Sequence, residues 1–211
     1  MEATARAVER LTAEHTVTVD GTVGYSGPLI TELREARYPN LGRTKGGGGS
    51  GDVLDVKAIT LYEHIDGTVR AWIDHYRKHA PEQLEDAILL LWETLQAEHA
   101  GGRLEDHERM YAMFPTWVEQ IEDHFDPPAE YELTSPCPDC EAGRIEEDGG
   151  TKWAVRVPVK VGRAVIAECH ACGRMWAGRE DLTQLAEAMG VEVDWVKLRE
   201  LETQAKETTP V

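Results

Sequence analysis

The sequence of 211 residues predicts an α+β protein made of several modest elements rather than one large domain. Apolar residues recur every three or four positions from residue 52 to 125, alternating patterns flank turn motifs in the first and last thirds, and Gly/Pro-rich breaks separate these stretches. We expect a small α/β element at 1–41, a Gly-rich linker at 42–51, an acidic antiparallel helical bundle at 52–130, a three-stranded ribbon at 131–178 and a pair of helices at 179–211.

The N-terminal element is predicted to be a helix, a hairpin and a second helix. Apolar residues have helical spacing over residues 2–14. Alternating Val and Thr then surround Asp20-Gly21, a dipeptide that suits a tight hairpin turn because glycine accepts positive φ. Ser26 is the expected cap of the second helix, and Pro28 is expected in its first turn.

Three helices are expected after the Gly/Ser-rich linker. The first begins at Asp52, the second at Pro81, and the third near Leu104, continuing past Pro115 to the Asp-Pro-Pro stop. Short connections between them predict antiparallel neighbours. His75 and His79 are four residues apart, but this stretch lacks the glutamate of an HExxH zinc motif, so we interpret them as exposed helix histidines.

The net charge of −17 is concentrated in the helical segment, where residues 51–130 hold 18 Asp and Glu against 6 Lys and Arg. Such a segment repels nucleic-acid phosphates and anionic lipid. No apolar run approaches the roughly 18 residues that span a bilayer, and the N-terminus lacks the layout of a signal peptide. We expect a soluble, cytoplasmic protein without a membrane partner.

All four cysteines lie in the last third as two Cys-x2-Cys pairs, Cys137 with Cys140 and Cys169 with Cys172. Two such turns brought together supply the four thiolates that zinc prefers. A redox role is less favoured because neither pair opens a helix that would lower a thiol pKa; another metal or an iron–sulfur cluster is a further alternative. Since protein fills all four positions, we expect one structural Zn²⁺ and no catalytic residues.

The 28 residues between the pairs predict strands at 141–148, 151–161 and 163–168. Gly143 and Gly173 are expected to take the positive φ that turns backbone N–H groups toward the sulfurs. Three antiparallel strands joining two Cys-x2-Cys turns resemble the zinc-ribbon family over residues 135–178. That resemblance implies the ligand role for the four cysteines only.

The expected second strand carries cations on one face and apolar residues on the other. Lys152, Arg156 and Lys160, with Arg163 nearby, are the candidate nucleic-acid-binding residues, because a basic stripe can follow a phosphate backbone. The alternative is a solvated sheet face without a ligand.

Residues 181–202 resemble a helix-turn-helix, with Gly190 at the turn. The second helix departs from a DNA reader, because Val193 and Trp195 stand where polar base contacts are expected and the charge of 192–200 is negative. Two packed helices that support the ribbon or dock on a protein are therefore favoured.

The hairpin with LITELREAR, the Gly-rich loop, the acidic helical segment and the stretch CHACGRMWAGREDLTQLAEAMG together resemble uncharacterised zinc-ribbon proteins of actinobacterial phages. This resemblance implies a phage protein in the host cytoplasm or the virion. We expect a non-enzymatic adaptor or regulatory protein that binds nucleic acid or a host transcription protein. The alternatives are a virion structural or assembly protein that uses zinc only for stability, and an enzyme fragment.

Overall fold

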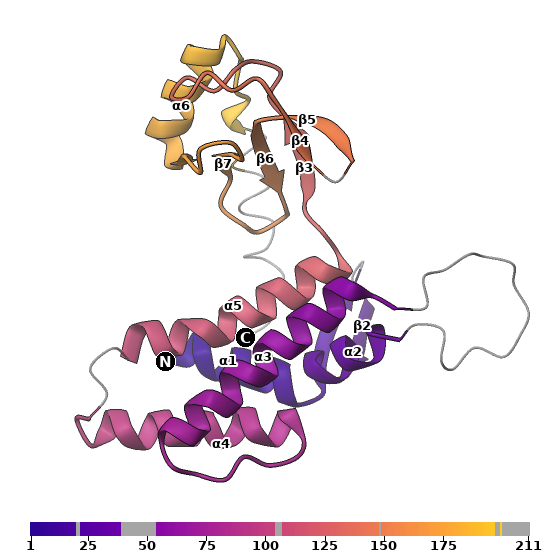
Figure 1. Cartoon of the computed structure of the whole chain (residues 1–211), viewed down its shortest axis with the longest axis vertical. Coiled ribbons are helices and arrows are strands. Elements are labelled where there is room, and N and C mark those ends of the chain that lie inside the picture. Colours follow the sequence, from indigo (N-terminus) through magenta and orange to yellow (C-terminus); the bar gives the residue numbers. More distant parts are fainter. Residues whose placement is uncertain (20–21, 39–53, 104–106, 148, 197–198, 200–211) are drawn as a thin grey trace, which may run out of the picture. The chain divides into compact units, whose positions relative to one another are not determined.

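The computed structural model describes residues 1–19, 22–38, 54–103, 107–147, 149–196 and 199. Helices and small antiparallel sheets confirm the α+β class. The chain divides into two compact units, Met1–Asp126 and Pro127–Val211, coloured from indigo to pink and from pink to yellow in Figure 1. The Gly-rich stretch at 42–51 lies outside the described residues.

The first unit opens with α1 (Glu2–Thr12), β1 (His15–Val19), β2 (Thr22–Ser26) and α2 (Leu29–Ala36). The predicted helix, hairpin and helix are confirmed, and β1 pairs with β2 through Val19 opposite Thr22; Asp20 and Gly21 lie outside the description. Ser26 is not the helix cap. Pro28 is the N-cap, without a side-chain cap, and the Ser26 hydroxyl instead donates to Glu32 at 2.5 Å.

Three longer helices complete this unit: α3 (Val56–His75), α4 (Leu84–Ala100) and α5 (His107–Phe125). The Asp55 side chain caps α3 by accepting from the Ala58 N–H at 3.0 Å, and it also pairs with His124 of α5 at 3.1 Å. As expected, α5 runs through Pro115. Figure 1 shows these helices beside α1 and α2.

One core joins all five helices of the first unit. Its fully buried side chains come from the N-terminal element as well as from the acidic helices: Leu11, Ile30, Leu33, Ile65, Leu91, Phe114 and Ile121. Apolar residues at helical spacing bury one face of each helix, so α1 and α2 pack in the same hydrophobic core as α3, α4 and α5. No helix in the described part of the chain is long and apolar enough to cross a membrane.

The second unit contains two antiparallel sheets and one helix. The four-stranded sheet has the order β3 (Ala129–Glu132), β6 (Val155–Val159), β7 (Ile166–Cys169) and β8 (Met175–Ala177). A separate hairpin joins β4 (Arg144–Glu147) to β5 (Gly150–Trp153). Helix α6 (Gly178–Met189) follows and ends at Gly190, whose φ of 66° is left-handed.

The expected second strand, 151–161, is interrupted at Ala154 and belongs to two sheets. β5 pairs with β4, whereas β6 pairs with β3 and β7. Ala154, Val155 and Arg156 are consecutive and all buried, so the expected alternation of a cationic and an apolar face does not continue across the break.

The C-terminal helical pair is described only in part. Helix α6 confirms its first member, and Leu185 and Met189 are buried against the sheets. Residues 191–194 have no regular secondary structure, and 195, 196 and 199 are helical. The remainder of the expected second helix lies outside the described residues.

Candidate metal centre

The four cysteines converge although 28 residues separate the two pairs. We call residues 137–142 the first knuckle and residues 169–174 the second knuckle. The four Sγ atoms all lie within 4.8 Å of one another, and those of Cys140 and Cys169 are 3.8 Å apart. The predicted ligand set is therefore gathered at one point between the sheets, an arrangement consistent with a zinc ribbon.

Backbone hydrogen bonds shape the first knuckle. The Cys137 N–H donates to the Ala142 carbonyl at 2.9 Å, and the Glu141 N–H donates to the Cys137 carbonyl at 2.9 Å. Glu141 has a φ of 60°, in the left-handed region that favours glycine. Gly143 was expected to take this role and does not, because the chain turns directly after Cys140, two residues earlier.

The second knuckle repeats this pattern at the same offsets. The Cys169 N–H donates to the Arg174 carbonyl at 2.8 Å, and the Gly173 N–H donates to the Cys169 carbonyl at 2.7 Å. Gly173 has a φ of 73°, as expected from its place after Cys172. The two knuckles are thus the same local structure built from different residues.

The peptide groups of Ala154 connect the second knuckle to Gly143, the residue that follows the first knuckle. Its N–H donates to the Gly143 carbonyl at 2.8 Å, and its carbonyl accepts from the His170 N–H at 2.8 Å. On the exposed side, the Arg174 Nε and the Asp139 Oδ2 pair at 3.2 Å across the knuckles. These contacts bring the two cysteine pairs together, and sequence patterns gave no signal for them.

The donor set fits a tetrahedral ion. Zinc–sulfur bonds of about 2.3 Å imply sulfur–sulfur edges of about 3.8 Å, which matches the Cys140–Cys169 distance. The first cysteine of each pair is buried and the second is exposed. Cys137 and Cys169 therefore anchor the knuckles in the core, whereas the sulfurs of Cys140 and Cys172 approach from the solvent side.

The thiol form of Cys140 is strongly favoured when only the neighbouring thiols surround it. A backbone hydrogen bond from Ala142 lowers its pKa, but desolvation and hydrogen bonds with the three other cysteines outweigh this and raise the pKa to about 12. A metal that binds as a thiolate complex must displace these protons. Affinity for such a metal therefore falls as the pH is lowered.

Histidines do not enlarge this cluster. His170 lies inside the second knuckle, and its Nδ1 is 3.8 Å from the Glu147 carboxylate. Among the described residues, the four cysteines are the only cluster of three or more side chains that could bind one metal ion. His75 and His79 are both exposed and belong to no such group.

The candidate nucleic-acid-binding cations do not form one exposed stripe. The Arg156 side chain is 2% exposed; its Nη1 is 2.5 Å from Glu147 Oε2, and its Nε donates to the Trp153 carbonyl at 3.0 Å. It is buried because carboxylates from β3 and β4 surround it. The Glu130 Oε1 of β3 lies 3.7 Å from the Arg156 Nη1. Lys152 also pairs with Glu130, at 3.5 Å.

The two other candidates, Lys160 and Arg163, lie in and beside the turn between β6 and β7. They are therefore separated in sequence from the buried Arg156. Nucleic-acid binding by these residues stays a prediction.

Residues 129–191 match the family model described as a domain of unknown function, DUF7340. The match begins at the first residue of β3 and ends just after Gly190, the C-cap of α6. It thus contains both sheets, both knuckles and the helix. No curated protein and no solved structure matches this chain.

Proposed function

We propose that this chain is a non-enzymatic adaptor of the phage zinc-ribbon type, in which one zinc ion stabilises the ribbon and the ribbon binds a protein partner. The observation that carries the proposal is the convergence of four cysteine sulfurs within 4.8 Å of one another. Four thiolates complete the coordination of zinc and leave no position for water or substrate. The ion then contributes folding free energy rather than chemistry.

Zinc is favoured over other metals by the chemistry of the donors. Four thiolates from two Cys-x2-Cys turns are typical of structural zinc sites. An iron–sulfur cluster is the competing occupant, and its visible absorption distinguishes it from colourless zinc.

An exposed surface at the second knuckle supports a protein partner. We call it the knuckle edge and define it by three exposed residues, His170, Arg174 and Met175 at the start of β8; Met175 is 52% exposed beside the buried Trp176. A methionine with three rotatable bonds adapts to varied apolar partner surfaces. The zinc and the Ala154 hydrogen bonds would hold this edge rigid, which lowers the entropic cost of binding.

A protein partner is favoured over nucleic acid because of charge. Arg156 is buried among carboxylates and Lys152 is paired with Glu130, so the charge of both cations is already met within the chain. The net charge of −17 on the whole chain also opposes the approach of phosphate. Nucleic-acid binding by the phage-type regulator, through Lys160 and Arg163, is the competing function.

Fluorescence anisotropy of labelled duplex and single-stranded DNA with the zinc-loaded full chain separates these functions. We expect no binding at about 50 mM salt, where phosphate contacts are strongest. Salt-dependent binding that Lys160→Glu and Arg163→Glu abolish would establish the nucleic-acid function instead. Gln184→Glu, which adds one negative charge on the exposed surface of α6, is a control for negative charge placed elsewhere on this unit.

For the protein partner, a photo-crosslinking residue placed at Met175 is expected to form one discrete adduct in host cells. The same residue at the exposed Glu187 of α6 is the control. Loss of the adduct in Cys169→Ser would tie binding to the folded ribbon. Equal adducts at both positions would contradict binding by the knuckle edge.

A further inference from the structure

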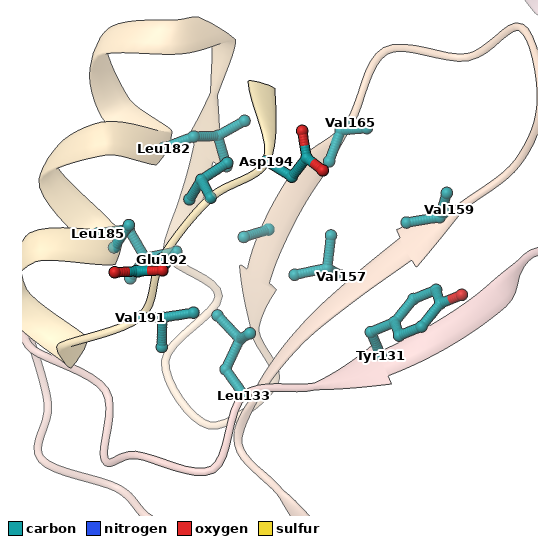
Figure 2. A pocket seen from close by; sticks show the side chains of 13 residues that line it. Tyr131, Leu133, Val157, Val159, Val165, Leu182, Leu185, Val191, Glu192 and Asp194 are labelled. Carbon is teal, nitrogen blue, oxygen red and sulfur yellow. The ribbon is translucent and has the colours of Figure 1, made fainter. Parts of the chain in front are cut away.

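An apolar groove of about 280 Å³ lies within the second unit, on one face of the four-stranded sheet. Its floor comes from β3, β6 and β7, one wall from α6, and the other from residues 191–194 (Figure 2). The apolar side chains that line it include Tyr131, Leu133, Val157, Val165, Leu182 and Leu185. The volume lies just below the range of roughly 300–1,000 Å³ that is typical of small-molecule pockets. It suits a few side chains of a peptide better than a whole cofactor.

Strand register explains why this face is apolar. Tyr131 is opposite Val157 in the β3–β6 pairing, and Leu133 lies on the same side of the chain two residues later. Helix α6 covers only part of this face, since Tyr131 remains 59% exposed and Val191 39% exposed. Exposed apolar surface with a polar rim is typical of sites that bind other molecules.

The charged side chains of the groove are all of one sign. Glu192 and Asp194, both exposed, contribute carboxylates to the wall, and no Lys or Arg is among the described residues that line the groove. The Asp194 carboxylate accepts from the Val196 N–H at 3.1 Å. This hydrogen bond fixes the position of the carboxylate and leaves its negative charge in place. The rim therefore favours an occupant that carries cations beside its apolar side chains.

The floor determines the conformation of the occupant. Its central strand, β6, is paired with β3 on one side and with β7 on the other. An extended peptide laid across this face would find few free backbone groups and would bury its own without partners. A helix satisfies its own backbone hydrogen bonds and binds a groove through apolar side chains three, four and seven residues apart. The groove is therefore suited to a helix.

We propose that this groove binds a basic amphipathic helix of a partner protein. The apolar face of the helix lies against the sheet, and its Lys or Arg side chains pair with Glu192 and Asp194. The net charge of −17 on the whole chain also raises the rate of encounter with a basic partner. The inference goes beyond the proposed function, because it assigns a second binding surface whose lining does not include Met175 of the knuckle edge.

Fluorescence anisotropy with a designed peptide tests the groove on the full zinc-loaded chain. The probe is a labelled helix of roughly 16 residues with a leucine face and lysines beside it. We expect saturable binding at about 50 mM salt, where charges are weakly screened. Peptides with Glu in place of Lys, or with Ser in place of Leu, are expected to bind at least about tenfold more weakly.

Two outcomes of this titration would overturn the proposal. Equal binding of the leucine and serine peptides would reduce the interaction to charge attraction alone. Absence of saturable binding would mean that the groove takes no basic helix. Analytical ultracentrifugation would then show whether a second copy of the chain fills it, because a dimer would be detected.

Variants of the groove give an independent readout. Glu192→Lys is expected to weaken binding of the lysine peptide about tenfold, and Tyr131→Ser, at an exposed position of the lining, several-fold. Glu187→Lys makes the same charge change on α6 outside the groove and is the matched control. Equal losses in Glu192→Lys and Glu187→Lys would contradict the assignment. Zinc content and the Met175 crosslink, measured on the same samples, report separately on the proposed function.

Discussion

The Arg156 guanidinium and the Glu147 carboxylate pair at 2.5 Å and join the two sheets of the second unit. Arg156 lies on β6 of the four-stranded sheet, and Glu147 ends β4 of the hairpin. The same guanidinium donates to the Trp153 carbonyl at 3.0 Å, at the end of β5. A cation that the sequence pattern places on a solvated face is therefore a link between sheets.

Arg156→Met is expected to lower the free energy of unfolding of the second unit by about 1.5–3 kcal/mol, because buried hydrogen bonds to a charged group are lost. Urea unfolding of the zinc-loaded chain, followed by tryptophan fluorescence, measures this. Replacing both partners, as Arg156→Met with Glu147→Leu, should recover part of the loss. Unchanged stability in Arg156→Met would show that the pair does not join the sheets.

The same pair predicts a pH dependence. The hydrogen bond from Arg156 holds the pKa of Glu147 below its ordinary value of 4.5, against desolvation and with help from the charges of Arg156, His170 and Lys152. Because the folded pKa is the lower one, the stabilisation is present above the unfolded pKa and is lost as the pH falls through the folded pKa.

We therefore expect the stability difference between the wild type and Glu147→Gln to be largest near about pH 6 and to shrink below about pH 4.5. Unfolding titrations under metal-saturating conditions measure it. A difference that stays constant across this range would contradict the ion pair as its source.

The positive φ shared by the two knuckles predicts opposite effects of two substitutions. Gly173→Ala places a side chain at a φ of 73° and is expected to lower stability by about 1–2 kcal/mol. Glu141→Gly relieves the corresponding strain at 60° and is expected to raise stability by about 0.5 kcal/mol, after the entropic cost of glycine. Thermal unfolding with zinc bound measures both, and equal effects of one sign would refute the shared geometry.

Separate cores predict separate unfolding of the two units. Phe114→Ala removes a fully buried ring from the helical core and is expected to cost that unit about 3–5 kcal/mol. Phe125→Ala, at a side chain that is 47% exposed, is the control and should cost far less. We expect zinc content and the exchange protection of residues 129–191 to stay unchanged in Phe114→Ala. Loss of zinc would show that the units depend on each other.

The sequence predicts the helices well because their signal is local. Stripes of apolar residues over α3, α4 and α5 repeat through several turns, and the cysteine spacing identifies the metal ligands without reference to the fold. The sequence signal for the hairpin strands β1 and β2 is equally local.

What the sequence does not predict depends on contacts between distant segments. Strand β3 is four exposed residues without alternation, and only its pairing with β6 defines it. The break at Ala154 arises because its peptide groups bond to Gly143 and to His170 of the second knuckle. The burial of Arg156 requires carboxylates from β3 and β4. The positive φ of Glu141 shows that the turn after the second cysteine, rather than a nearby glycine, fixes that conformation.

Metal analysis of the purified chain tests the central claim most directly, with Cys169→Ser as the variant and Ala171→Ser, between the second pair of ligands, as the control. We predict about one zinc per chain in the wild type and in Ala171→Ser. In Cys169→Ser we predict loss of zinc and of exchange protection in residues 129–191, with α3, α4 and α5 still folded. Stoichiometric zinc retained by Cys169→Ser, or a wild-type chain that binds no zinc, would contradict the account.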